Sequence, residues 1–180
     1  MRKLVLLLLL VAGLGHAPLL LAATCTSSAS GNWNDGTKWT GLGTCTTSGP
    51  VAGDAAIVTG GFNMTINAAG LGAASIALGQ LGAGNNGTLT FNSGSSLTVS
   101  GVVTMGNGTR TGNIDMTAGG TLTLASFTYN AGTFTPGAGT VVLTGTSTLP
   151  NNATLGTFNN LTINSGGRSE ERRVGKECRL

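Results

Sequence analysis

The chain has 180 residues, of which 8% are charged, 4% are aromatic and 31 are glycine. Only five charged residues lie in the segment 24–167, which has a formal charge of −1 and contains no glutamate or histidine. This segment therefore offers no basic surface for nucleic acid, and it lacks the residues for most acid–base and metal chemistry. Its abundance of Gly, Thr, Asn and Ser predicts strands and turns rather than long helices.

Residues 1–23 have the pattern of a secretory signal peptide. Two basic residues precede an apolar run from Leu4 to Val11, and small residues close the segment. We expect cleavage after Ala23 and no membrane insertion once the signal is removed. One alternative is an uncleaved membrane anchor. Another is lipidation of Cys25, although the large aliphatic residue expected three positions before such a cysteine is missing.

Cys25 and Cys45 are the two cysteines of the segment 24–167. An even number of cysteines in an exported chain predicts a disulfide. Closing a loop of this size is worth about 3 kcal/mol in the loop-entropy model. The alternative is a pair of free thiols. A zinc site is excluded, because the segment has no further Cys or His that could serve as a ligand.

Internal repeats in the segment 55–167 predict the fold. From Gly87 onward, the sequence aligns without a gap on the sequence from Gly112 onward at a shift of 25. A looser third copy follows Ile114 by 27 positions at Val141, and a further one follows 20 later at Leu161. Apolar residues alternate with threonine in each copy, so one face of each strand is expected to be buried. The pairs expected from the shift of 25 are Leu89 with Ile114, Phe91 with Met116, Leu97 with Leu122, Val99 with Leu124 and Val102 with Phe127.

Short strands separated by Gly, Asn and Ser corners at a period of 20 to 27 predict a parallel β-solenoid. Each coil would rise by about 4.8 Å, the spacing of neighbouring strands. Earlier coils are expected around Phe62, Met64 and Ile66 and around Ile76 and Leu78. The alternative is an antiparallel β-sandwich, which has similar densities of strands and turns but does not call for tandem repeats.

The last thirteen residues, 168–180, differ abruptly in composition and hold eight of the charged residues. Residues 168–178 resemble the translation of a common sequencing adapter. We interpret the tail as an artefact and expect the true C-terminus to be missing. The alternative is a basic, helix-prone C-terminal tail.

The opening CTSSASGNWNDGTKW at 25–39, followed by Cys45, Pro50 and Asp54, resembles the N-terminal cap of bacterial secreted β-solenoid proteins. It is most similar to the large exported proteins associated with biogenesis of mannose-sensitive haemagglutinin (MSHA) pili. Residues 132–145 and 158–164 resemble the strand repeats of bacterial surface adhesins. The resemblance implies a right-handed parallel β-helix, with a disulfide-bonded cap at 24–54 and repeats at 55–167. It also implies a structural or adhesive role without catalytic residues.

Trp33 and Trp39 are expected to close the first coil as part of the cap. The alternative is an exposed platform on which sugars stack. Asp35 and Asp54 are expected to accept hydrogen bonds in Asx turns, and the alternative is that they share a calcium ion.

We therefore expect a non-catalytic segment of a bacterial cell-surface protein, either secreted or held at the outer surface, that needs no cofactor. Its expected partners are extracellular polysaccharide, a host surface or pilus components. One alternative is a fragment of a β-helical carbohydrate-active enzyme whose catalytic part is missing. Glycoside hydrolysis needs two carboxylates within about 10 Å, and the segment offers only Asp35, Asp54 and Asp115. Another alternative is ice binding by the outward threonines of 88–90 and 121–123, against which the irregular period counts.

Overall fold

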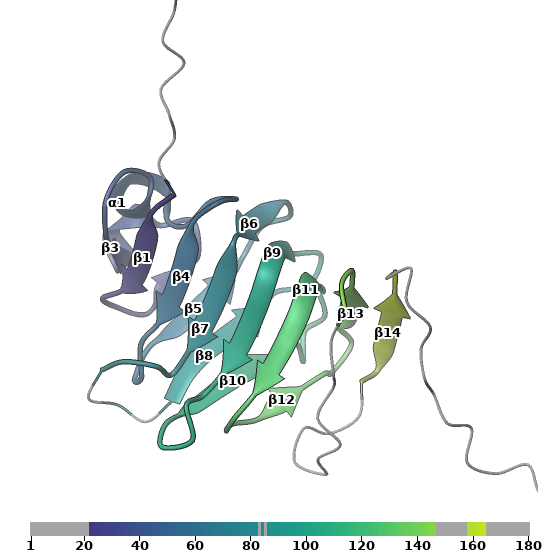
Figure 1. Ribbon diagram of the computed structural model, residues 1–180. Helices are drawn as coiled ribbons and strands as arrows, with labels where there is room; N and C mark the ends of the chain where they lie inside the picture. Colours follow the sequence, from purple (N-terminus) through teal and green to yellow (C-terminus); the bar gives the residue numbers. More distant parts are fainter. Residues whose placement is uncertain (1–21, 83, 85, 147–157, 165–180) are drawn as a thin grey trace, which may run out of the picture.

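The computed structural model describes residues 22–82, 84, 86–146 and 158–164 (Figure 1). Most of the predicted signal peptide, the repeat around Leu149 and the charged tail lie outside these residues. Within them, helix is limited to the 3-10 turn η1 (Gly36–Lys38) and the single turn α1 (Cys45–Ser48). No helix in the described ranges is long and apolar enough to cross a membrane. The prediction of a strand-rich chain is confirmed.

The strands form two sheets (Figure 1). The larger contains β1 (Thr24–Ser27), β3 (Trp39–Thr40), β4 (Ala55–Val58), β6 (Leu71–Ala73), β7 (Ser75–Leu78), β9 (Ser96–Met105), β11 (Thr121–Tyr129), β13 (Thr140–Leu143) and β14 (Asn160–Ile163). The smaller contains β2 (Gly31–Asn32), β5 (Asn63–Ile66), β8 (Asn86–Phe91), β10 (Thr111–Asp115) and β12 (Phe134–Thr135).

All the strand pairs of the described residues are parallel except β1 with β3. The antiparallel sandwich is therefore the wrong alternative. The physical reason is that equivalent strands of successive repeats bring their apolar residues together only when they lie side by side and run in the same direction.

The long strands β9 and β11 divide the larger sheet into two columns. In the first column, β6, residues 96–99 of β9, residues 121–124 of β11, β13 and β14 pair in succession. The second column holds β1, β4, β7 and the C-terminal parts of β9 and β11. The smaller sheet is the third column. From β5 to β11 the chain passes through the third, first and second columns in that order three times.

Strand register stacks like residues on like and so builds the core. In the third column Met64, Leu89, Ile114 and Phe134 are successive partners, and all four are buried. Strands β8 and β10 alternate buried and accessible positions, so every second residue of each points into the core. Burial of such rows is the main stabilising term in a chain with so few charges.

The shift of 25 is confirmed for three of the predicted pairs, Leu89 with Ile114, Leu97 with Leu122 and Val99 with Leu124. The fourth testable pair is wrong, because Phe127 lies opposite Val103 and not Val102. The bend of β9 contains two residues, Ser100 and Gly101, where that of β11 contains only Ala125. The register therefore changes by one at this bend.

The alignment of the third copy is also wrong. Val141 lies beside Leu122 in the first column, whereas Ile114 has Phe134 as its partner in the third. This repeat is shorter than the shift of 27 implies, because Phe134 follows Ile114 by only 20 positions. The next step is confirmed, since Leu161 is the partner of Val141.

The segment 24–54 shares its sheets with the repeats. Strand β1 extends the second column and β2 extends the third. In the first column no described strand pairs with β6 on this side, and the loop 48–52 lies there instead. This loop packs closely on β6, because a Cβ atom on Gly72 would lie 3.1 Å from the backbone nitrogen of Ala52.

Candidate functional site

A disulfide joins Cys25 of β1 to Cys45 of α1, with 5.2 Å between their Cα atoms. The predicted pairing is confirmed. Both cysteines are fully buried, so the bond fixes α1 against the first strand from inside the fold.

Trp33 and Trp39 lie next to this disulfide-bonded end and are 0% and 2% exposed. Their rings pack edge to face with centroids 5.1 Å apart. The indole nitrogen of Trp33 donates to the Pro50 carbonyl at 3.0 Å, and that of Trp39 donates to the Trp33 carbonyl at 2.9 Å. Because neither ring presents a face to solvent, neither offers the sugar-stacking platform considered as an alternative.

Asp54 precedes β4 and is only 3% exposed. One carboxylate oxygen accepts a hydrogen bond from the backbone nitrogen of Ala23 at 2.9 Å. The other accepts from the Thr44 hydroxyl at 2.6 Å and from the backbone nitrogen of Val51 at 3.2 Å. Burial raises the pKa of Asp54, but these hydrogen bonds outweigh it and leave the pKa below its ordinary value.

The two disulfide sulfurs and an Asp54 oxygen lie within 4.8 Å of one another and form the one grouping of possible metal ligands in the part of the chain that the structure describes. Bonded to each other, the sulfurs are not the thiolates that metals need. The arrangement is therefore a structural cluster and not a metal centre.

The other two carboxylates among the described residues, Asp35 and Asp115, stabilise turns, as the sequence predicted for Asp35. This residue precedes η1 and accepts from the backbone nitrogen of Thr37 at 3.0 Å. The hydrogen bonds from Thr37 hold the pKa of Asp35 below its ordinary value. Asp115 makes the same contact with the backbone nitrogen of Thr117 at 2.9 Å.

Asp35 follows β2 and Asp115 ends β10, which is three strands away in the third column. Three spacings amount to about 14 Å, beyond the roughly 10 Å that a pair of glycosidase carboxylates requires. These two residues therefore do not form a hydrolytic pair.

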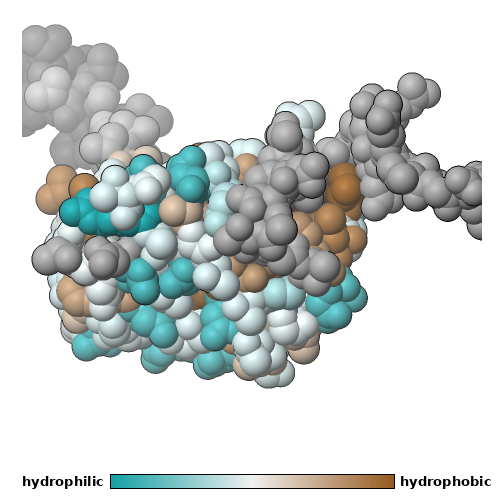
Figure 2. Space-filling view, turned by 90° about the horizontal axis from the view of Figure 1, so that it is seen from below, coloured by the Kyte–Doolittle hydropathy of each residue, from teal (hydrophilic) through white to brown (hydrophobic). Residues whose placement is uncertain are grey.

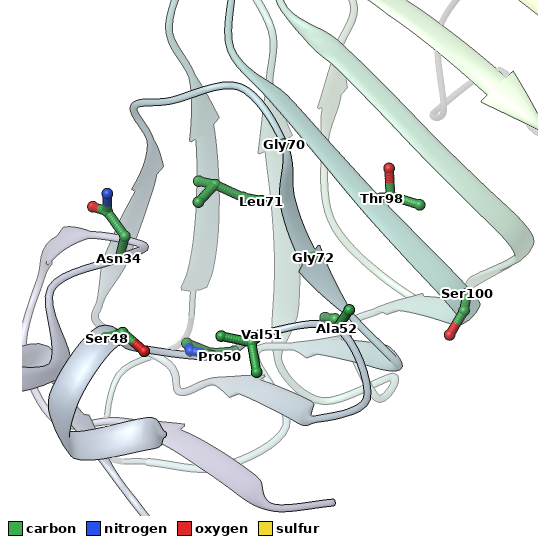
Figure 3. Close-up of a pocket in the computed structure, with 11 residues that line it drawn as sticks. Asn34, Ser48, Pro50, Val51, Ala52, Gly70, Leu71, Gly72, Thr98 and Ser100 are labelled. Atoms are coloured by element: carbon green, nitrogen blue, oxygen red, sulfur yellow. The ribbon is translucent and has the colours of Figure 1, made fainter. Parts of the chain in front are cut away.

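A shallow cavity of about 370 Å³ lies between the loop 48–52 and β6 (Figure 3). Thr98 and Ser100 of β9 border one side, and Asn34 and Ser48 border the other. The remaining lining is apolar or backbone, from Pro50, Val51, Ala52, Gly70, Leu71, Gly72 and Ala73. With no titratable side chain in its wall, the cavity can hold an uncharged ligand but supplies no acid or base.

The outward side of the first column carries two rows of mainly hydroxyl-bearing residues, which we call the hydroxyl face. Its first row is Ser96, Thr121, Thr140 and Asn160, and its second is Thr98, Thr123, Val142 and Thr162. Partners in a row are about 4.8 Å apart. Every side chain in the two rows is partly or fully exposed, and none is charged.

The irregular repeat length does not disturb these rows. Leu122 follows Leu97 by 25 positions and Val141 follows Leu122 by 19, yet the three residues lie in register. Length differences are absorbed in the turns, because ladder hydrogen bonds and the buried rows fix the strands. The irregular period therefore does not prevent the strands of the first column from lying in register, although the rows contain Ser, Asn and Val as well as Thr.

The surface seen in Figure 2 is mainly hydrophilic or neutral, and hydrophobic atoms gather mostly towards its ends. The patch on the right lies where Figure 1 places β13 and β14. Of the described residues, the large exposed apolar ones are Leu42, Leu81, Leu161 and Ile163.

Comparison with protein-family models, with curated proteins and with solved structures found no match. The function of the chain has to be argued from its own geometry. The sequence analysis missed the hydroxyl face as a whole, because the rows depend on the register between repeats of unequal length. The alternation of threonine with leucine was its only local signal.

Proposed function

We propose that this chain is an exported, non-catalytic structural or adhesive segment of a bacterial cell-surface repeat protein. In this proposal the three columns are the sides of a right-handed parallel β-helix, and α1 with both tryptophans caps its first coil. The repeated passage through the three columns supports a coil. The buried disulfide supports an oxidising compartment outside the cytoplasm.

The hydroxyl face is the observation that carries the adhesive role. Its side chains stand on parallel strands and are therefore held in fixed positions. A neutral polysaccharide presents hydroxyl groups at a regular repeat and can form many hydrogen bonds along such rows. Each bond is worth only about 1 kcal/mol net, so affinity comes from their number.

The binding experiment uses the exported protein on matrices of neutral polysaccharides. We expect retention that high salt does not reduce, because the face has no charge to screen. Thr123→Lys should reduce retention about tenfold by placing a charge in the centre of the face. Thr88→Lys is the matched control, since Thr88 is equally half-buried but belongs to the third column.

Retention of the wild type on charged matrices alone would contradict the adhesive role. So would an equal loss in both lysine variants. A crystal structure of the exported protein tests the handedness and closure of the helix.

Ice binding is a second candidate, favoured by the alignment of Thr98 with Thr123 and of Thr121 with Thr140. Such a face would order water at the spacing of its hydroxyls. Its test is arrest of ice-crystal growth by the wild type, with loss of that arrest in Thr123→Lys and not in Thr88→Lys.

A further inference from the structure

Asp54 is a buried carboxylate with no cationic partner among the described residues. Of the basic side chains there, Lys38 lies 3.9 Å from Asp35, and Arg110 donates to the backbone oxygen of Gln80. Three neutral donors satisfy the oxygens of Asp54 but leave its charge unbalanced. A positive charge on one of these donors would strengthen its hydrogen bond to the carboxylate.

One of these donors lies next to the predicted processing site. The backbone nitrogen of Ala23 is 2.9 Å from the Asp54 carboxylate, which is also the usual distance between an ammonium and a carboxylate. Ala23 is held from its other side as well, because its carbonyl accepts from the backbone nitrogen of Ala55 at 2.8 Å. Ala22, in contrast, is exposed.

We propose that the signal is removed between Ala22 and Ala23, and that Asp54 binds the new α-ammonium group of Ala23. This inference rests on the proposed export of the chain. In the cleavage, water adds its oxygen to the carbonyl carbon of Ala22 and the bond to the Ala23 nitrogen breaks. Ala22 leaves as a carboxylate, and the Ala23 amine takes up protons to become an ammonium.

A chain that began at Thr24 would not form this pair. In a planar trans peptide the carbonyl and the following N–H point in opposite directions. Since the Ala23 carbonyl points to β4, the Thr24 nitrogen points to the other edge of β1. Cleavage after Ala23 would remove one donor from Asp54 and the acceptor of the Ala55 nitrogen.

Local sequence does not separate the two bonds. Each follows an alanine, and each has a leucine two residues before that alanine, Leu20 or Leu21. A signal peptidase acts on the chain before it folds. What separates the two products is the fold, because only the longer one places a positive charge at Asp54.

The first test is the mass and N-terminal sequence of the full chain after export from a bacterial host. We expect Ala23 as the first residue. A chain beginning at Thr24, or at any other position within the exported protein, would overturn the inference while leaving export intact. A cytoplasmic chain that keeps Met1 would overturn the proposed export itself, so the two failures are distinguishable.

The second test is the rate at which an amine-reactive reagent modifies the N-terminus at neutral pH, read from the N-terminal peptide. We expect the folded protein to react about tenfold more slowly than the same chain in urea, because pairing keeps the amine protonated. Asp54→Asn should restore fast modification, whereas Asp35→Asn is the matched control and should not. Equal rates in the folded and unfolded wild type would overturn the inference even if Asp54→Asn failed to fold.

Discussion

Asp54 connects three backbone segments at the disulfide-bonded end, through Ala23, Thr44 and Val51. Because its pKa is lowered in the fold, its carboxylate stabilises the protein above the unfolded pKa of about 4. This contribution is lost as the pH falls through the folded pKa. The stability of the wild type should therefore decline in acid.

Asp54→Asn should remove the contribution of Asp54 to the pH dependence of stability. It should also lower the free energy of unfolding by about 1 to 3 kcal/mol at neutral pH, because the three donors lose their carboxylate acceptor. Urea unfolding at several pH values measures both effects. A variant as stable as the wild type at pH 7, with the same acid slope, would disprove the role of Asp54.

Leu122 and Thr123 are adjacent residues on opposite sides of β11. Leu122 is 1% exposed and stacks between Leu97 and Val141. Leu122→Ala should cost about 2 to 5 kcal/mol because it leaves a cavity in the row. Thr123→Ala should change stability by less than about 0.5 kcal/mol. Denaturant unfolding of both variants measures the difference, and equal losses would contradict the orientation of the strand.

Glycines determine how tightly the corners between elements can stack. Gly106 follows β9 with φ of +67°, and a Cβ atom there would lie 2.4 Å from the Ala131 carbonyl oxygen. Gly94 has a similar φ of +72°, but its Cβ position is open.

Gly94→Ala should cost about 1 to 2 kcal/mol for its backbone conformation alone. Gly106→Ala should cost about 3 kcal/mol or more, because the stacked corner must also move apart. Thermal unfolding compares the two variants. Similar Tm values would show that the corners are not in contact.

The strands were predictable from sequence because their alternation repeats within each coil. Thr88 to Phe91 and Thr121 to Leu124 follow this period, and the structure places both in strands as expected. The two errors in register arose where the chain turns, at the bend within β9 after Val99 and in the short repeat before Val141. A bend of one residue or two looks alike in a sequence rich in Ser, Gly and Ala, and only the packed rows select the partner.

The candidate site was predictable where it depends on covalent chemistry, as for Cys25 and Cys45, and where a turn is local, as for Asp35. The contact between Asp54 and Ala23 was not, because 31 residues separate them in sequence. It depends on β1 and β4 lying side by side.

At the scale of the whole molecule, the two ends of the columns differ. The N-terminal end contains α1 and the buried tryptophans. At the opposite end, β14 pairs with β13 alone among the described strands. Its Leu161 and Ile163 are 37% and 42% exposed, although their partners Val141 and Leu143 are buried.

This edge is expected to pair with a second copy of the chain, because within the described residues it presents both backbone groups without a strand partner and an apolar row. Association should rise with protein concentration and should not weaken in high salt, since β14 carries no charge. Ile163→Lys should shift association to at least about tenfold higher concentration by placing a charge in the row. Leu42→Lys is the control, because Leu42 is 79% exposed and lies outside the strands. Light scattering over a dilution series measures the effect, and a wild type that stays monomeric at high concentration would show that the β14 edge is already covered.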